Sequence, residues 1–154
     1  VFDALDEAMD KANESQDREF TTIMFDIDFF KQVNDTYGHA GGDAVLISFA
    51  KLLESEITSP NIVGRIGGEE FLAILYLNQD QAAEFCKKLI IKINDNTVNF
   101  EGIDIKISSS GGVAFSSETN TSADLTNKAD ERLYEAKKSG RNRFKLIDSE
   151  LVGD

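Results

Sequence analysis

Four acidic residues at the ends of two apolar segments are the side chains best suited to chemistry in this sequence. Asp26 and Asp28 close the run TTIMFDID, and Glu69 and Glu70 precede the run FLAILYL. If the two runs are neighbouring strands, three or four carboxylates meet at one rim of a sheet. Two like charges about 4 Å apart repel by roughly 4 kcal/mol at an effective dielectric constant near 20, so a proton or a cation is expected between them.

The type and number of these ligands indicate which cation. Hard oxygen ligands in small number favour Mg²⁺ or Mn²⁺, with substrate phosphates completing the coordination. The alternative is that Glu69 and Glu70 lie on a solvated hairpin tip, and their spacing alone does not decide between the two interpretations.

Other polar residues that could take part in such chemistry have structural explanations as well as functional ones. Lys31 and Asn34 share the polar face of a short predicted helix. Asp43 lies near a predicted helix start, where Asp is a favoured cap, and Lys137 lies in a last helical turn, where a cation is favourable. The Gly67–Gly68 pair suits a tight turn, but it would also let a ligand approach the backbone closely.

The overall charge narrows the classes of partner. Of 154 residues, 28 are acidic and 16 are basic, which gives a formal net charge of −12. Broad binding to nucleic acid or to an anionic membrane needs a basic face, so neither partner is expected. A phosphate-bearing ligand would have to be met by a few placed cations or by bound metal.

The chain has one cysteine, Cys86, and one histidine, His39. A disulfide within the chain is therefore impossible, and a zinc site of the Cys/His type is excluded by count. A Ser–His–carboxylate triad would depend on His39 alone, which argues against it. No apolar run reaches the length of a membrane span, and no basic-then-apolar pattern typical of a signal peptide is seen in the sequence. Because the first residue is Val1 rather than Met, we expect a fragment of a longer protein.

The length predicts one domain, and the apolar periodicity predicts helices and strands in alternation. Helices are expected over 2–15, 29–37, 43–59, 79–94 and 121–140. Strands are expected over 21–27, 61–66, 69–77 and 143–147, with further strands inside 100–115. Gly38 is expected to end the second helix, Gly111–Gly112 to mark a β-bulge, and Thr121 with Asp124 to form a capping box. This order indicates an α+β sandwich, with helices packed on a largely antiparallel sheet.

Three segments together resemble a known family. IGGEEF at 66–71 and FDIDFFKQVNDTYGHAGGD at 25–43 closely resemble the GGDEF domain of bacterial diguanylate cyclases. ADERLYEAKKSGRNRF at 129–144 is similar to that family's last helix and strand, and SSSGGVAF at 108–115 to the strand before that helix. The resemblance covers nearly the whole chain and makes 1–154 a single GGDEF domain. It implies a fold similar to the palm of nucleotidyl cyclases and polymerases, and condensation of two GTP into cyclic di-GMP with release of two pyrophosphates.

The resemblance also implies roles for the acidic residues. Mg²⁺ (or Mn²⁺) would be held by Asp26, by Glu69 or Glu70, and by the carbonyl of Ile27. The metal would neutralise the triphosphate and lower the pKa of the attacking 3′-hydroxyl. One glutamate of the pair would be the general base; we favour Glu70 as base and Glu69 as the firmer metal ligand.

Phosphate contacts follow from the same resemblance. Lys31 would stabilise charge developing on the phosphates, and Lys137 and Arg141 would clamp the terminal phosphate. Backbone N–H groups of Phe29 and Phe30, at a helix start, would face the same anion.

For the nucleoside, the resemblance implies that Asn34 and Asp43 read the guanine edge and that His39 lies near the ribose or serves packing. Each domain would present one GTP, so a second GGDEF domain is expected as catalytic partner. We expect the domain in the cytoplasm, on a parent protein that could be tethered to the inner membrane.

Two departures from the family pattern matter. The product-binding Arg-x-x-Asp motif is replaced by Thr58-Ser59-Pro60-Asn61, so we expect the inhibitory site to be absent or very weak. The family's Leu-Thr-Gly-Leu segment and Asn-Arg pair, which precede the first helix, are missing. The alternative to a cyclase is a non-catalytic module that binds GTP or cyclic di-GMP, but both glycines and both glutamates of the motif are intact. Another palm-type nucleotidyl transferase would leave Asn34 and Asp43 unused, and a purely structural domain would leave the carboxylates unexplained.

Overall fold

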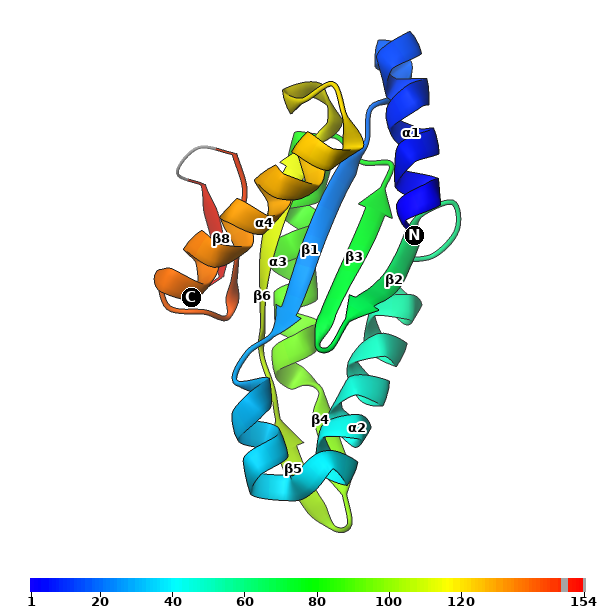
Figure 1. The fold of residues 1–154 in the computed structure, drawn as a ribbon. Helices are drawn as coiled ribbons and strands as arrows, with labels where there is room; N and C mark the ends of the chain where they lie inside the picture. The colour runs from blue at the N-terminus through cyan, green and yellow to red at the C-terminus, as the bar shows by residue number, and fades with distance from the viewer. Residues whose placement is uncertain (148–149, 154) are drawn as a thin grey trace.

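The computed structural model describes residues 1–147 and 150–153, apart from the side chain of Gln16. Its centre is a six-stranded sheet in the order β2-β3-β1-β6-β7-β8 (Figure 1). The strands of this sheet are β1 (Thr21–Ile27), β2 (Ile62–Gly67), β3 (Glu70–Leu75), β6 (Ser109–Phe115), β7 (Arg143–Lys145) and β8 (Leu151–Gly153). All neighbours are antiparallel except β6 and β7, which are parallel. The predicted α+β class with a largely antiparallel sheet is confirmed.

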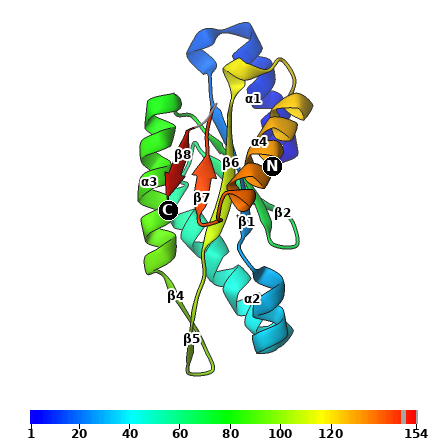
Figure 2. The same ribbon diagram turned by 90° about the vertical axis from the view of Figure 1, so that its left-hand side faces the viewer.

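Helices cover both faces of the sheet. α1 (Phe2–Glu14) and α4 (Ser122–Lys138) lie on one face, and α2 (Phe30–Glu56) and α3 (Gln79–Asp95) lie on the other (Figures 1 and 2). A separate hairpin, β4 (Thr97–Phe100) with β5 (Ile103–Lys106), extends beyond the sheet beside the first half of α2. Within the described residues, no helix is long and apolar enough to span a membrane.

β1 is the central strand because its sequence is β-branched and apolar on both faces. All seven of its residues are buried, between β3 and β6. Alternate side chains enter two cores: Phe25 packs towards α2 and α3, and Met24 packs towards α1 and α4. Asp26 comes two residues after Met24, so it belongs to the α1/α4 face of the sheet.

α2 is broken at Gly38, as the sequence predicts. Gly38 has φ 77° and ψ 175°, which a residue with a Cβ rarely adopts, so the chain changes direction there while remaining helical on both sides. The second helical part therefore begins directly after Gly38, earlier than expected. Asp43 lies inside this part rather than at its start, so its interpretation as a helix cap is wrong.

Gly111 and Gly112 do not form the β-bulge expected from the sequence. Both lie in regular β6 and pair with β1 without a shift in register. They are small because their neighbours are close: a Cβ on Gly112 would lie 1.8 Å from the carbonyl oxygen of Ala129, and one on Gly111 would lie 1.9 Å from the Phe144 ring. Glycine at 112 thus lets the backbone of α4 rest directly on the sheet.

The remaining elements follow the prediction closely, with two additional strands, β4 at Thr97–Phe100 and β8. β2 and β3 form the expected hairpin, with a register irregularity between Arg65 and Gly67. Thr121 caps α4, its Oγ1 accepting a hydrogen bond from the backbone N–H of Asp124 at 3.1 Å. The predicted capping box is therefore only half formed, since the reciprocal bond to the Asp124 side chain is not found among the described residues. β8 was not predicted; it extends the edge of the sheet by pairing with β7.

Candidate active site

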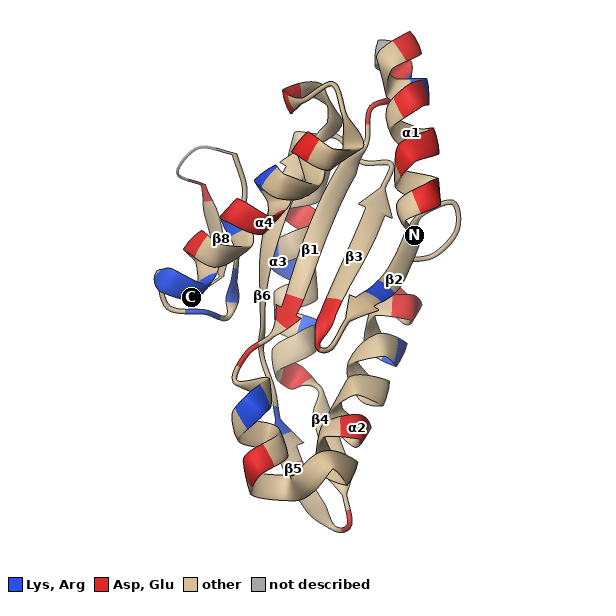
Figure 3. Cartoon of the chain, in the orientation of Figure 1, with Lys and Arg blue, Asp and Glu red and all other residues tan. Residues whose placement is uncertain are grey.

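Asp26 and Glu70 face each other across the adjoining ends of β1 and β3. They are paired residues in the antiparallel register, so their side chains project on the same face, towards α4. Figure 3 shows acidic segments side by side at these strand ends. Asp26 is 6% exposed and Glu70 is half-buried. The backbone N–H of Ile27 donates to the carbonyl of Glu69 at 3.3 Å, which fixes the glutamate turn against β1.

The surroundings of Asp26 and Glu70 disfavour a negative charge on both carboxyl groups at once. Burial raises the pKa of Asp26, and the charges of Glu69 and Asp28 add to the effect, while Lys137 opposes it. Burial also raises the pKa of Glu70, and Asp26 is the next largest cause. Like charges directly opposite each other in a sheet destabilise it. The fold therefore keeps a carboxylate pair that is unfavourable for stability.

Lys137 is the cation nearest to the pair. Its Nζ forms an ion pair with Oδ2 of Asp26, and its side chain is partly exposed. α4 can deliver Lys137 to this rim because Gly112 lets the helix lie against β6 and β1. The lysine expected to bind phosphate and the aspartate expected to bind metal are thus in direct contact, so binding both ligands requires this ion pair to rearrange.

The position of Arg141 is set by the hydrogen bonds that end α4. The N–H of Arg141 donates to the carbonyl of Ala136 at 3.0 Å, and that of Gly140 to the carbonyl of Lys137 at 3.4 Å, which is the Schellman pattern. The Arg141 guanidinium then lies over the Phe29 ring, 4.7 Å from its centroid. Phe29 is 53% exposed, so this contact is made at the surface of the site.

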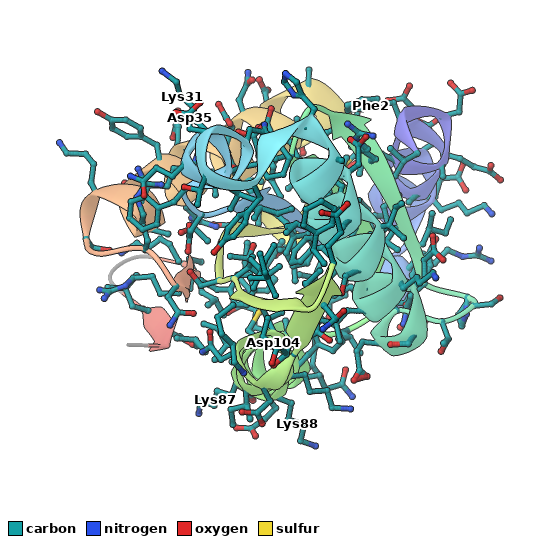
Figure 4. All side chains as sticks on the ribbon, turned by 90° about the horizontal axis from the view of Figure 1, so that it is seen from below. Phe2, Lys31, Asp35, Lys87, Lys88 and Asp104 are labelled. Atoms are coloured by element: carbon teal, nitrogen blue, oxygen red, sulfur yellow. The ribbon has the colours of Figure 1, made fainter. Side chains whose placement is uncertain are left out.

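Phe29 and Phe30 begin α2 with backbone donors. Phe29 is the N-cap residue and adopts a left-handed conformation, with φ 56° and no side-chain capping bond. The first N–H groups of a helix have no partner within the helix, so they are available to an anion. Lys31 follows in the first turn, is exposed, and projects outwards on the side of the molecule where α1 and α4 lie (Figure 4).

Asn34 and Asp43 are brought near each other by the break in α2. Asn34 Oδ1 would lie 1.8 Å from a Cβ on Gly42, so Asn34 packs against the second part of α2 beside Asp43. Asn34 is half-buried and Asp43 is exposed, which leaves the carboxylate accessible to a ligand. His39 is exposed just after the break, so the structure gives it no packing role in the core.

Asp28 differs from the other acids of the motif. The sequence suggests that it joins the carboxylate cluster, but it is 3% exposed and its oxygens accept hydrogen bonds from Ser108, Ser110 and the backbone of Asn142. It therefore lies behind the rim rather than on it. The sequence carried a partial indication, since a buried polar partner was to be expected for the serines of SSSGGVAF.

The donors at the rim fit a metal that takes few protein ligands. In the part of the chain that the structure describes, no three His, Cys, Asp or Glu side chains are grouped closely enough to hold an ion by themselves. The donors that stand together are Asp26 and Glu70, with Glu69 in the adjoining turn and cations alongside. Mg²⁺ commonly binds through one or two carboxylates and completes its coordination with phosphates and water. A closed, structural metal site is not supported.

Comparison with known proteins agrees with this geometry. The chain is 37% identical over 131 residues to diguanylate cyclase A of Treponema denticola, a match covering 84% of this chain and 35% of that protein. The chain thus spans about a third of that relative's length. Among solved structures, the GGDEF domain of YfiN (PA1120) from Pseudomonas aeruginosa superposes with a TM-score of 0.88 at 29% identity, covering 94% of this chain and 91% of that one.

The active GGEEF domain of a diguanylate cyclase from Vibrio cholerae superposes with a TM-score of 0.84 at 31% identity, covering 96% of this chain and 94% of that one. The family described as "Diguanylate cyclase, GGDEF domain" matches residues 1–143, which contain the strand ends, the glutamate turn and the end of α4 described above. The chain belongs to the GGDEF domain family of diguanylate cyclases.

Proposed function

We propose that this domain condenses two GTP molecules into cyclic di-GMP and releases two pyrophosphates. The observation that carries the proposal is the pairing of Asp26 with Glu70 on one face of the sheet, with Lys137 in contact and Arg141 at the end of the same helix. Opposed carboxylates suit a metal ion, and cations beside them suit a triphosphate. This combination explains how a chain of net charge −12 can accept a polyanionic substrate.

Asp26, Glu69 and the Ile27 carbonyl would hold Mg²⁺ or Mn²⁺, with Glu70 beside them. When bound, the metal supplies charge neutralisation at the triphosphate and a lowered pKa for the 3′-hydroxyl. The pKa values of Asp26 and Glu70 are raised first by burial and then by neighbouring carboxylates. This supports the assignment, because a bound cation would stabilise the charged form of both groups.

Glu70 would accept the proton of the 3′-hydroxyl. A carboxylate whose pKa is raised is a better base near neutral pH than an ordinary one. The freed 3′-oxygen bonds to the α-phosphorus of the second GTP, and the bond from that phosphorus to the pyrophosphate oxygen breaks. The same exchange in the opposite direction closes the ring, so two protons and two pyrophosphates leave for each product.

The phosphates would be held by the start of α2 and the end of α4. The N–H groups of Phe29 and Phe30 would bind phosphate oxygens, Lys31 would stabilise charge developing in the transition state, and Lys137 and Arg141 would clamp the terminal phosphate. The contact of Arg141 with Phe29 supports this arrangement, because it brings the two ends together.

Asn34 and Asp43 would select guanine. Asp43 would accept from the base N1–H and exocyclic amine, and Asn34 would pair at another edge, with His39 close to the ribose. A site that hydrogen-bonds a base discriminates against analogues that leave its polar groups unpaired. The proximity of Asn34 to the segment that carries Asp43 supports one shared base site.

A second GGDEF domain completes the reaction. One domain binds one GTP, so two copies must face each other to bring each 3′-hydroxyl to the other α-phosphate. Specific activity is therefore expected to fall on dilution. Because Thr58-Ser59-Pro60-Asn61 replaces the Arg-x-x-Asp motif, product inhibition through that site is expected to be absent or very weak.

The test is to incubate the purified domain at high concentration with GTP and Mg²⁺ and to separate the nucleotides by chromatography. Wild-type protein should yield cyclic di-GMP, and Glu70→Gln should not. Glu131→Gln, an exposed acid on α4, is the matched control and should keep its activity. If a fusion to a dimerising coiled coil also yields no product while GTP binds, the domain is a binding module and the proposed activity is wrong.

A further inference from the structure

We propose that Asp28 is a positioning residue: its buried carboxylate holds the Arg141–Asn142 turn in the geometry that binds the terminal phosphate of GTP. The inference rests on the proposed function, because it concerns how the phosphate-binding arginine is placed. It assigns a role to a buried acid that the metal and base chemistry leave unused.

The first observation is that Asp28 is fully engaged. Its Oδ1 accepts from the Ser110 hydroxyl at 2.6 Å, and its Oδ2 accepts from the Ser108 hydroxyl at 2.6 Å and from the backbone N–H of Asn142 at 2.9 Å. Nη1 of Arg141 lies 4.0 Å from Oδ1. The Asp28 side chain is completely buried. With these partners it is not placed to bind substrate directly, so any effect on the reaction must pass through them.

The second observation is that the turn held by Asp28 is strained. Arg141 has φ 65° and Asn142 has φ 51°, a left-handed conformation that residues other than glycine seldom adopt. The side-chain Oδ1 of Asn142 is also buried without a hydrogen-bond partner among the described residues. Such a conformation persists only where its surroundings enforce it, and strain of this kind is concentrated at ligand-binding sites. The bond from the Asn142 N–H to Asp28 restrains the turn from the side of β1, while the bond from the Arg141 N–H to the Ala136 carbonyl ties it to α4.

The third observation links the turn to the start of α2. Phe29 directly follows Asp28, and its ring lies against the Arg141 guanidinium at 4.7 Å. Phe29 is itself left-handed, with φ 56°. One dipeptide therefore meets Arg141 twice, with the carboxylate of Asp28 and the ring of Phe29. Both contacts hold the guanidinium beside the residues that begin α2.

If Asp28 only stabilised the fold, its replacement would weaken the binding of every nucleotide equally, so the variants must separate the turn from the rest of the fold. Asp28 also connects to β6 through its serines, so Asp28→Ala would disturb the fold as well as the turn. Asp28→Asn keeps the shape and one acceptor oxygen but removes the negative charge facing Arg141. Ser108→Ala removes a single hydrogen bond from Asp28 and leaves the charge in place, which provides a second, milder variant.

The experiment measures the binding of 3′-deoxy-GTP and 3′-deoxy-GDP with Mg²⁺, since neither nucleotide has the hydroxyl needed for turnover. Asp28→Asn should weaken binding of the triphosphate about tenfold, as expected for loss of an aligned charge-assisted bond, and that of the diphosphate much less. Ser108→Ala should show the same selectivity with a smaller effect. Asp10→Asn, an exposed acid on α1, should change neither affinity.

The double variant Asp28→Asn/Arg141→Ala separates positioning from general destabilisation. If Asp28 acts through Arg141, the double variant should bind the triphosphate no more weakly than Arg141→Ala alone. The inference would be overturned if the affinity losses of Asp28→Asn and Arg141→Ala added in the double variant. It would also be overturned if Asp28→Asn weakened both nucleotides equally, or if Asp28→Asn or Ser108→Ala left triphosphate affinity unchanged. If wild-type protein binds neither nucleotide, the proposed function itself fails, and this outcome is distinct from a wild type that binds and an Asp28 variant that is unaffected.

Discussion

Replacing Glu70 by glutamine should stabilise the fold while it abolishes the proposed activity. Glu70 is paired directly with Asp26 across β3 and β1, and both side chains face α4. Glutamine keeps the length of the side chain and its hydrogen-bonding oxygen but removes the charge. The ion pair between Lys137 and Asp26 would remain, and it would then neutralise an isolated carboxylate rather than one of two.

The size of the gain follows from the geometry of the strand pair. A favourable pair of directly opposed side chains in a sheet adds roughly 0.2–1 kcal/mol to the free energy of unfolding, and a pair of like charges lowers it by a similar amount. For a chain of this length, 1 kcal/mol corresponds to about 2–4 °C in Tm. We therefore expect Glu70→Gln to melt up to about 4 °C above the wild type in the absence of divalent cations at neutral pH.

The sign of the pH dependence can also be derived. The pKa of Glu70 is raised above 4.5 in the folded state, so the folded protein binds protons more readily than the unfolded chain. The wild type accordingly loses stability as the pH rises from about 4.5 through the folded-state pKa. The advantage of Glu70→Gln should be present at neutral pH and disappear below about pH 4.

The assay is thermal unfolding followed by circular dichroism between pH 4 and pH 8, with a chelator and then with Mg²⁺. Glu131→Gln serves as the control for charge alone and should melt like the wild type at each pH. Mg²⁺ should raise the Tm of the wild type more than that of Glu70→Gln, because a negative charge beside the ion has been removed. A Glu70→Gln protein that melts below the wild type at neutral pH, or whose advantage is the same at every pH, would refute the reasoning.

Three further changes test the elements that position the site. Gly112→Ala should lower the free energy of unfolding by about 1–3 kcal/mol in a denaturant titration, because its Cβ would meet backbone rather than a flexible side chain; an unchanged value would contradict the close packing of α4. Burial alone would raise the pKa of Glu118, but hydrogen bonds from Arg132 and the Phe115 N–H hold it below its usual range, so wild-type stability should fall as the pH drops below about 4.5. Glu118→Gln should cost roughly 3–5 kcal/mol at neutral pH and lack that acid-dependent loss, since it leaves Arg132 buried without its charge partner. Asp43→Asn should reduce kcat/KM for GTP about 10- to 100-fold through lost base hydrogen bonds, with an unchanged Tm because Asp43 is exposed; an equal loss with another purine triphosphate would argue against guanine reading.

Much of the fold could be predicted because local physics and tertiary packing agree. β1 is apolar along its length, and a strand of that kind must be covered on both faces. Gly38 ends a helical segment because its conformation needs a residue without a Cβ. Asn78 caps α3 through a full capping box, which depends on a few neighbouring residues and so is local information.

The sequence predictions are wrong where the reason for a residue lies in a contact with a part of the chain that is distant in sequence. The Gly111–Gly112 pair suggests a bulge when only β6 is considered, but the reason for both glycines lies in α4 and in Phe144. Asp28 looks like another member of the acidic cluster until the β6 serines are placed around it. β8 is short and makes its ladder only with β7, so its own pattern carries little information.

For the candidate site too, the sequence motif predicts some features, and only the fold shows the others. The carboxylates and cations are recognisable from the sequence because their types are unusual beside apolar strands. Their roles are not: only the register shows that Glu70, and not Glu69, is the direct partner of Asp26 across the strands. The prediction of Glu70 as base and Glu69 as metal ligand thus stays a prediction. Besides burial, the charge of Asp26 contributes to the raised pKa of Glu70, whereas Lys137 and Glu69 are the charges that act most on the pKa of Asp26.

The location of the charges explains how an acidic domain could handle a triphosphate. Most acidic residues of this chain of net charge −12 are exposed, so water and salt screen their charges. Asp26, Lys137 and Arg141 are partly or fully buried and act at short range. Next to these charges, the start of α2 at Phe29 provides backbone N–H donors, and Phe29 itself carries no charge. A general negative potential would repel nucleic acid and anionic lipid, while the local donors would still accept one nucleotide and its metal. If the domain binds GTP as proposed, its preference for a small phosphate ligand over nucleic acid or anionic lipid would follow from the contrast between its acidic surface and the cations at the site.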